Sequence, residues 1–205
     1  MSFDISPTNI PQSFEEIAGE LINKHHLEVN GYSIKLCDLE FYWNDGGDHA
    51  DASTHEHGYE SGQLRPHGSG YDLALKNSNG YGGILIRGVL KDDVPTYGPI
   101  RCADVIFKAG ESLLKGGFHV QLIEKKVPSD YLLFPTVRIG LKEEGKFWNQ
   151  NYRFICCRAD YLCEVEGKTK LCEAIGESEV KVEDAVLKAA LVTPRRKVAK
   201  PSLKE

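Results

Sequence analysis

The sequence lacks the patterns that mark secreted, membrane-spanning and metal-stapled proteins. Its six cysteines follow no CxxC or zinc-ribbon spacing, and four of them lie in apolar, strand-like segments. We therefore expect buried free thiols in a reducing compartment, not disulfides or metal ligands. No run of about 18 apolar residues occurs, and the first residues lack the charged-then-apolar order of a signal peptide. These absences predict a soluble, cytoplasmic protein without a membrane partner.

An excess of basic charge is also lacking. The 25 basic and 30 acidic side chains give a net charge of -5, and the last segment, residues 193–205, holds five of the basic ones against one acid. A protein that bound nucleic acid through its overall field would be basic, so contact with nucleic acid must come from a local patch and this tail. We expect a single domain over residues 1–192 and a flexible basic tail over residues 193–205.

Helix and hairpin signals dominate the first half of the chain. Residues 13–27 begin with a Ser-x-x-Glu capping box and continue with apolar residues at helical spacing, which predicts a helix. The Asn30-Gly31 pair between two alternating apolar runs predicts a β-hairpin whose second arm covers residues 33–43. A polar loop without an element of its own is expected to follow, up to Gly70.

The remaining segments add one more hairpin, helices and strands. "YDLAL" and "ILIRGVL" predict the second hairpin, and a helix is expected to begin near Pro99. Further strands are expected at "FHVQLIEK", "TVRIGL", "YRFICCR" and "DYLCEVE", and a final helix at "VEDAVLKAAL". Hairpins with interspersed helices, without regular strand–helix alternation, favour an α+β architecture with one antiparallel or mixed sheet.

Two charged residues in apolar strands indicate a site. The strand period of two places Glu40 and Tyr42 on one face of the predicted second arm, opposite an apolar face. Arg87 lies inside the apolar run "ILIRGVL", and arginine is almost never fully buried without an anionic partner. We expect Glu40 to be that partner. Such a buried pair is a better indication of a site than of stability.

Three kinds of chemistry could use this carboxylate. A metal site would draw on a loop rich in acids and histidines, although its spacing matches no established pattern. The residues of that loop are Asp48, His49, Asp51, His55 and His57. A nucleophilic serine or cysteine would need an elbow or paired motif, and the sequence contains neither. The third possibility is a water activated by Glu40, with aromatic rings that hold a flat substrate.

Six short motifs in colinear order resemble those of the alkyladenine (3-methyladenine) DNA glycosylase family. These motifs are "LEFYW", "DASTH", "ILIRGV", "GPIRCADVIF", "TVRIGL" and "YRFICC", and together they span about residues 35 to 157. The resemblance implies a curved, mainly antiparallel β-sheet with flanking helices. It also implies a monofunctional DNA glycosylase of base-excision repair, a hydrolase that acts on N-glycosyl bonds without a cofactor.

The resemblance also assigns roles to residues. The target base would be flipped out of DNA and held between Tyr42 and His55, while Glu40 activates the attacking water and Arg87 positions it. The partner would be DNA that contains a modified base, bound by a monomer.

Three further substrate contacts follow from the resemblance. Tyr71 or His67 would serve as the wedge in the duplex, and Leu73 or Ala74 would occupy the position that screens the base edge. Arg138 would contact phosphate, as would Arg65, Lys142 and the tail.

Two other functions remain open from the sequence. One is a metal-dependent hydrolase or oxygenase that uses the loop at residues 48–57. The other is a non-catalytic module that binds a nucleobase or another ligand.

Overall fold

The computed structural model describes residues 3–110, 117–126 and 133–156. The strand expected at residues 160–166, the helix expected at residues 182–191 and the basic tail all lie outside these residues. So do three of the six cysteines. The three described cysteines, Cys37, Cys102 and Cys156, are buried as expected.

The described residues form two helices and a nine-stranded antiparallel sheet. The helices are α1 (Ile10–Lys24) and α2 (Pro99–Ala109). The strands are β1 (His25–Val29), β2 (Tyr32–Asn44), β3 (Leu64–His67), β4 (Gly70–Asn77), β5 (Gly80–Lys91), β6 (Val94–Tyr97), β7 (Val120–Glu124), β8 (Leu133–Thr136) and β9 (Arg153–Cys156). The expected α+β class is therefore confirmed.

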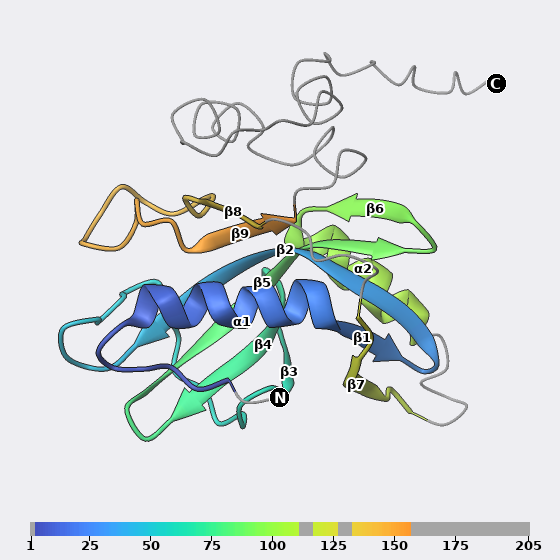
Figure 1. The fold of residues 1–205 in the computed structure, drawn as a ribbon, viewed down its shortest axis with the longest axis horizontal. Coiled ribbons are helices and arrows are strands. Elements are labelled where there is room, and N and C mark those ends of the chain that lie inside the picture. Colours follow the sequence, from blue (N-terminus) through green and yellow to red (C-terminus); the bar gives the residue numbers. More distant parts are fainter. Residues whose placement is uncertain (1–2, 111–116, 127–132, 157–205) are drawn as a thin grey trace, which may run out of the picture.

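The sheet curls into a half-barrel around its central strands β2 and β5 (Figure 1). The strand order is β3-β4-β5-β2-β1-β7, so β3 and β7 lie at the two ends of this path. The short strand β6 pairs antiparallel with the last residues of β5, and β9 pairs with the middle of β2 and with β8. As a result, β2 has neighbours on both sides along most of its length, and its side chains face two interior regions.

The two helices lie on opposite faces of the sheet. In Figure 1, α1 crosses in front of the strands and α2 lies beyond them. Phe14 of α1 packs on Phe41 of β2 with ring centroids 4.8 Å apart. On the other face, the fully buried Cys102 of α2 lies among charged groups that include Asp38 and Arg87. The apolar core is therefore on the α1 side, and the charged side chains of β2 and β5 face α2.

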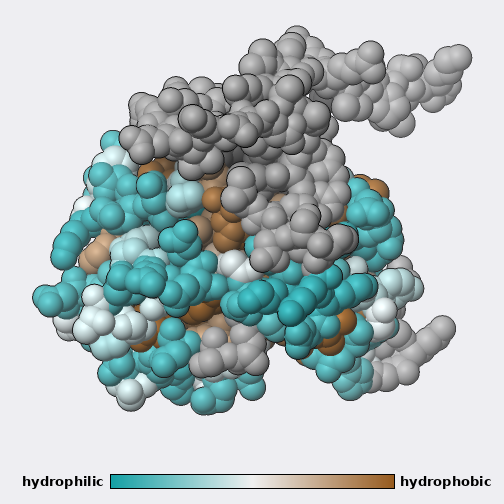
Figure 2. All heavy atoms as spheres, in the orientation of Figure 1, coloured by the Kyte–Doolittle hydropathy of each residue, from teal (hydrophilic) through white to brown (hydrophobic). Residues whose placement is uncertain are grey.

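The solvent-facing surface on the α1 side is mainly hydrophilic. Figure 2 shows this in the coloured atoms, where hydrophobic areas are small and lie between polar ones. The apolar side chains of α1, such as Phe14 and Leu21, are fully buried beneath that surface. This arrangement is the amphipathic pattern of a helix that covers one face of a sheet.

The first hairpin forms as the sequence predicts. Val29 pairs with Tyr32, and the two loop residues Asn30 and Gly31 have φ angles of 47° and 85°. A two-residue type I′ turn requires positive φ at both central positions, which asparagine and glycine tolerate best.

The start of the first helix differs from the prediction. The helix begins at Ile10, and the side chain of Asn9 caps it by accepting a hydrogen bond from the Gln12 N–H at 3.3 Å. Ser13 lies inside the helix, where its hydroxyl accepts a hydrogen bond from the Ser6 N–H. The prediction that the helix begins at Ser13 is therefore wrong. The N-terminus is set earlier in the sequence, by the Asn9 cap and by the proline in the first turn.

The observed strands differ from the predicted ones in three places. The polar segment before Gly70 contains β3, which pairs with β4. The segment "TVRIGL" is not a strand, since β8 ends at Thr136 and a loop follows. The strand β6 was not anticipated.

The buried histidine of β1 should make the fold sensitive to acid. His26 is 3% exposed, and burial together with Lys125 and Lys35 lowers its pKa from 6.5 to about 4. Between about pH 6.5 and about pH 4, the unfolded chain therefore binds a proton at His26 that the folded chain does not. The free energy of unfolding should decrease as the pH falls through this range, because protonation favours the unfolded state. In urea unfolding measured across this range, His26→Gln should show a smaller loss of stability than the wild type.

A second variant identifies the cause of the shift. Lys125→Gln removes one of the positive charges, so its pH dependence should lie between those of the wild type and His26→Gln. Equal pH dependence in all three proteins would assign the acid sensitivity to other groups.

Candidate functional site

The carboxylate of Glu40 is completely buried and is held by three groups from different segments. Arg87 of β5 contacts both of its oxygens at 3.3 Å, Nε to Oε1 and Nη1 to Oε2. The Tyr42 hydroxyl donates to Oε2 at 2.9 Å, and the Ile139 N–H donates to Oε1 at 2.8 Å. The predicted pairing of Glu40 with Arg87 is thus present, and the backbone donor from the loop after β8 was not foreseen.

Burial and the neighbouring donors act on the pKa of Glu40 in opposite directions. Desolvation raises the pKa above the ordinary value of 4.5, while Arg87 and the Ile139 N–H lower it, and the net shift is upward. Burial likewise raises the pKa of Tyr42, so this residue donates its proton to Glu40 as a neutral phenol. The site therefore contains a carboxylate that takes up a proton more readily than an ordinary glutamate.

The ring of Tyr42 has one of its faces covered by Arg138. The guanidinium carbon of Arg138 lies 4.6 Å from the ring centroid, a cation–π arrangement. Arg138 is itself fixed by Asp51 at 2.6 Å and by the carbonyl oxygens of Phe41 and Phe147. Arg138 was expected to contact substrate. In the structure its guanidinium is instead buried against Tyr42, and it does not line the cavity described below.

A cavity of about 800 Å³ lies against this charged cluster. Tyr42 and Arg87 form part of its wall, and His55 from the following loop forms another part. Ile139 and Lys142 close it on one side, and the first residues of α2 lie at another side. Three of the predicted site residues thus meet at one cavity, with Glu40 directly behind two of them.

A second buried carboxylate, Asp72 of β4, also faces this cavity. Asp72 and Glu40 pair with opposite sides of Leu85, so all three side chains point to the same face of the sheet. Asp72 binds Arg65 and accepts a hydrogen bond from His67 Nε2 at 2.7 Å. The His67 ring is fixed by this bond and by the Ser69 N–H, which donates to Nδ1.

Sequence reasoning did not select Asp72, although a signal was available. An acid inside the apolar strand "YDLAL" demands a buried partner by the same argument that was applied to Arg87. Its partners, Arg65 and His67, come from β3, which was read as a loop.

Two other predicted substrate contacts lie elsewhere. Tyr71 points to the opposite side of β4 and lines a different cavity. Ala74 is fully buried and does not line either cavity. Tyr71 faces away from the first cavity because neighbouring residues of a strand alternate between the two sides. Ala74 is on the same side as Asp72 but is buried there, so neither residue reaches the first cavity.

The residues proposed as a metal-binding loop do not converge in the described part of the chain. His49 is buried between the Trp43 carbonyl and the Tyr152 hydroxyl, and Asp51 pairs with Arg138. His57 contacts the Gly82 carbonyl at 2.6 Å. These three side chains thus have separate structural partners, and His55 alone among these histidines lines the cavity.

No family model matches the chain, and no curated protein matches it either. Neither of the described helices is long and apolar enough to cross a membrane.

The absence of a side chain at Gly83 makes room for Asp72. A Cβ at Gly83 would lie 2.7 Å from Asp72 Oδ2, closer than real Cβ atoms approach. Gly83→Ala should therefore displace the Asp72 carboxylate and destabilise the protein by about 1–3 kcal/mol. Chemical denaturation measures this loss, and Gly58→Ala is the matched control because no atom lies within 4 Å of its Cβ. An equally small effect of both substitutions would show that Asp72 adjusts freely.

Proposed function

We propose that this protein is a DNA glycosylase that hydrolyses the N-glycosidic bond of a damaged or modified base flipped out of DNA. The observation that carries the proposal is the convergence of Tyr42, His55 and Arg87 on one cavity, with Glu40 bound to two of them. These four residues come from three separate sequence motifs, "LEFYW", "DASTH" and "ILIRGV". Their meeting at a cavity large enough for a purine favours a common role.

In the proposed reaction, a water molecule is the nucleophile and Glu40 is the general base. The water oxygen forms a bond to the sugar C1′ as the C1′–N bond breaks, and the bonding electron pair leaves with the base. The proton of the water passes to Glu40, and the products are a free base and an abasic sugar. A positively charged alkylated base leaves without further help, whereas a neutral base also needs a proton.

Arg87 is suited to hold the attacking water. Its two contacts with Glu40 measure 3.3 Å, longer than the 2.9 Å and 2.8 Å contacts from Tyr42 and Ile139. A close guanidinium–carboxylate pair has contacts of about 2.7–2.9 Å. The 3.3 Å contacts of Arg87 are nevertheless too short for a water to lie between the two groups, so the attacking water must approach from the cavity, where Arg87 forms part of the wall.

The cavity wall offers stacking and hydrogen bonding to a flat ring. Because Arg138 covers one face of Tyr42, the other face remains for a base, with exposed His55 at the same cavity. The hydroxyl of Thr54, a residue that is 8% exposed, also belongs to this wall and has no hydrogen-bond partner within the described residues. Lys142 at the same cavity is available for the phosphates beside the flipped nucleotide, whereas Arg65 is paired with Asp72.

The proposal is tested by incubating the protein with labelled duplex and single-stranded oligonucleotides that carry alkylated or deaminated bases. Chromatography of the supernatant detects the released base, and alkaline cleavage of the strand detects the abasic site. Release of a base with an abasic product supports the proposal. Intact oligonucleotides across the whole panel contradict it.

Substitution of the general base, Glu40, should abolish the reaction. Glu40→Gln cannot accept the proton of water, so its rate should fall by about two or more orders of magnitude. The substitution also removes a charged partner of the buried Arg87, and breaking a buried ion pair costs up to about 3–5 kcal/mol, so thermal unfolding must accompany the assay. Glu15→Gln on the exposed side of α1 is the matched control and should retain activity.

The pH profile of the wild type provides a test that does not depend on a variant. The reaction requires ionised Glu40, and burial raises the pKa of this group above its ordinary value of 4.5. Activity should therefore fall with decreasing pH with a midpoint above 4.5, and unfolding must be absent at that pH. A profile that stays flat down to pH 4.5 would remove Glu40 from the role of base.

A non-catalytic nucleobase-binding module is favoured by one observation, the complete burial of Glu40 behind four contacts. In such a module, Glu40 would fix Tyr42 and Arg87 in place for binding. Tight binding of modified or abasic DNA without release of any base would support this second function.

A further inference from the structure

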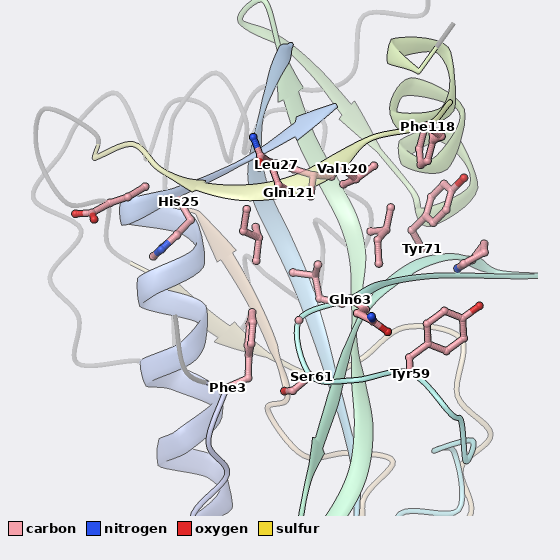
Figure 3. A pocket seen from close by; sticks show the side chains of 16 residues that line it. Phe3, His25, Leu27, Tyr59, Ser61, Gln63, Tyr71, Phe118, Val120 and Gln121 are labelled. Atoms are coloured by element: carbon pink, nitrogen blue, oxygen red, sulfur yellow. The ribbon is translucent and has the colours of Figure 1, made fainter. Parts of the chain in front are cut away.

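A second cavity of about 890 Å³ lies on the side of the half-barrel opposite to the charged cluster (Figure 3). One wall consists of β1 and β7, with Leu27, Val120 and Leu122. The other wall is the β3–β4 hairpin, with Leu64 and Tyr71, and the loop that precedes it. In Figure 3, Val120 from one wall and Tyr71 from the other point toward a shared open space.

The cavity exists because the curled sheet does not close. The strands β7 and β3 lie at the two ends of the strand path, and the described residues record no ladder between them. The rings of Tyr71 and Phe118 meet across this gap, stacked with centroids 6.4 Å apart. The space beside this aromatic contact has apolar side chains on both walls, and it resembles the mouths of β-barrels where small molecules bind.

The lining has little charge to offer a ligand. Among the described residues that line the cavity there is no lysine and no arginine, and the single acid is Glu124. The basic side chain in the lining is His25, whose Nδ1 contacts the Glu20 carbonyl at 3.0 Å. A phosphate, sulfonate or carboxylate buried here would meet no lysine or arginine, which is costly. The cavity therefore disfavours nucleotides, fatty acids and other anions.

Aromatic rings and one amide define what the cavity can accept. Phe3, Tyr59, Tyr71 and Phe118 contribute rings to the lining. The side-chain oxygen of Gln63 accepts a hydrogen bond from the Glu60 N–H at 3.0 Å, so its NH₂ group is the part that can donate to a ligand. Figure 3 shows Gln63 between Tyr59 and the hydrophobic walls.

We propose that this cavity is a second ligand site, which takes an uncharged aromatic molecule that carries a hydrogen-bond acceptor. Its volume lies within the range of about 300–1,000 Å³ that is typical of small-molecule sites. It is separate from the first cavity because alternate residues of the β3–β4 hairpin face opposite sides: Pro66 and Tyr71 face the second cavity, Arg65 and Asp72 the first. The proposal stands independently of the glycosylase activity.

Two fluorescent probes that differ by one sulfonate test the charge requirement. The neutral N-phenyl-1-naphthylamine should bind the full-length protein saturably with one site per chain, measured by fluorescence titration. Its anionic counterpart, 8-anilinonaphthalene-1-sulfonate, should bind at least about tenfold more weakly, because its charge would be buried without a partner. Equal affinity for both probes, or no saturable binding of the neutral one, overturns the proposal.

A pair of valine substitutions tests the location. Val120→Trp fills the cavity from β7 and should weaken binding of the neutral probe by about tenfold or more. Val94→Trp places the same side chain on β6, where Val94 is 63% exposed, and should leave binding unchanged. Equal effects of both substitutions would place the probe elsewhere. If Val120→Trp does not fold, the comparison of the two probes on the wild type still tests whether the site excludes an anion.

Discussion

The burial of the Glu40 carboxylate constrains the whole site. With no exposure to water, Glu40 depends on Arg87 from β5, Tyr42 from its own strand and the Ile139 N–H from the loop after β8. These three groups come from distant parts of the sequence, and loss of any one would leave a buried charge incompletely satisfied. The carboxylate thereby fixes the positions of an aromatic ring, a guanidinium and a loop around one point.

Two further buried arginines pair with acids of other segments close to the Glu40 cluster. Arg153 of β9 binds Asp38 of β2 through two contacts of 2.8 Å and 2.5 Å. Arg138 connects the loop after β8 to Asp51 and to the backbone of β2. Such pairs add little net stability, because desolvation offsets most of the attraction. The directional contacts of Arg138 hold the loop after β8, which has no ladder of strand hydrogen bonds, in a defined position, whereas the Arg153 pair joins two strands that already pair.

The sequence predicted the parts of the fold and site that depend on local periodicity. Alternation in β2 placed Glu40 and Tyr42 on one face, and the solvation requirement of a buried arginine identified the pair with Arg87. It did not locate Tyr71 correctly, because a single sequence leaves the register of β3 and β4 open. Arg138 was misread for a related reason: a guanidinium that binds phosphate and one that supports a tyrosine have the same local pattern. The short strand β3 contains a proline and polar residues, which have low strand propensity, so its pairing with β4 determines its structure.

The β3–β4 hairpin separates two chemically different interiors with a partition that is one strand layer thick. Leu64 pairs with Leu73 and Arg65 pairs with Asp72, so apolar pairs and charged pairs alternate along the ladder. A register slip of one residue turns every side chain of a strand to the other face. Such a slip would move guanidinium and carboxylate groups into the aromatic space and leucines into the polar one. The pairing of these few residues therefore sets the chemical identity of both compartments at once, and neither can be altered there without consequence for the other.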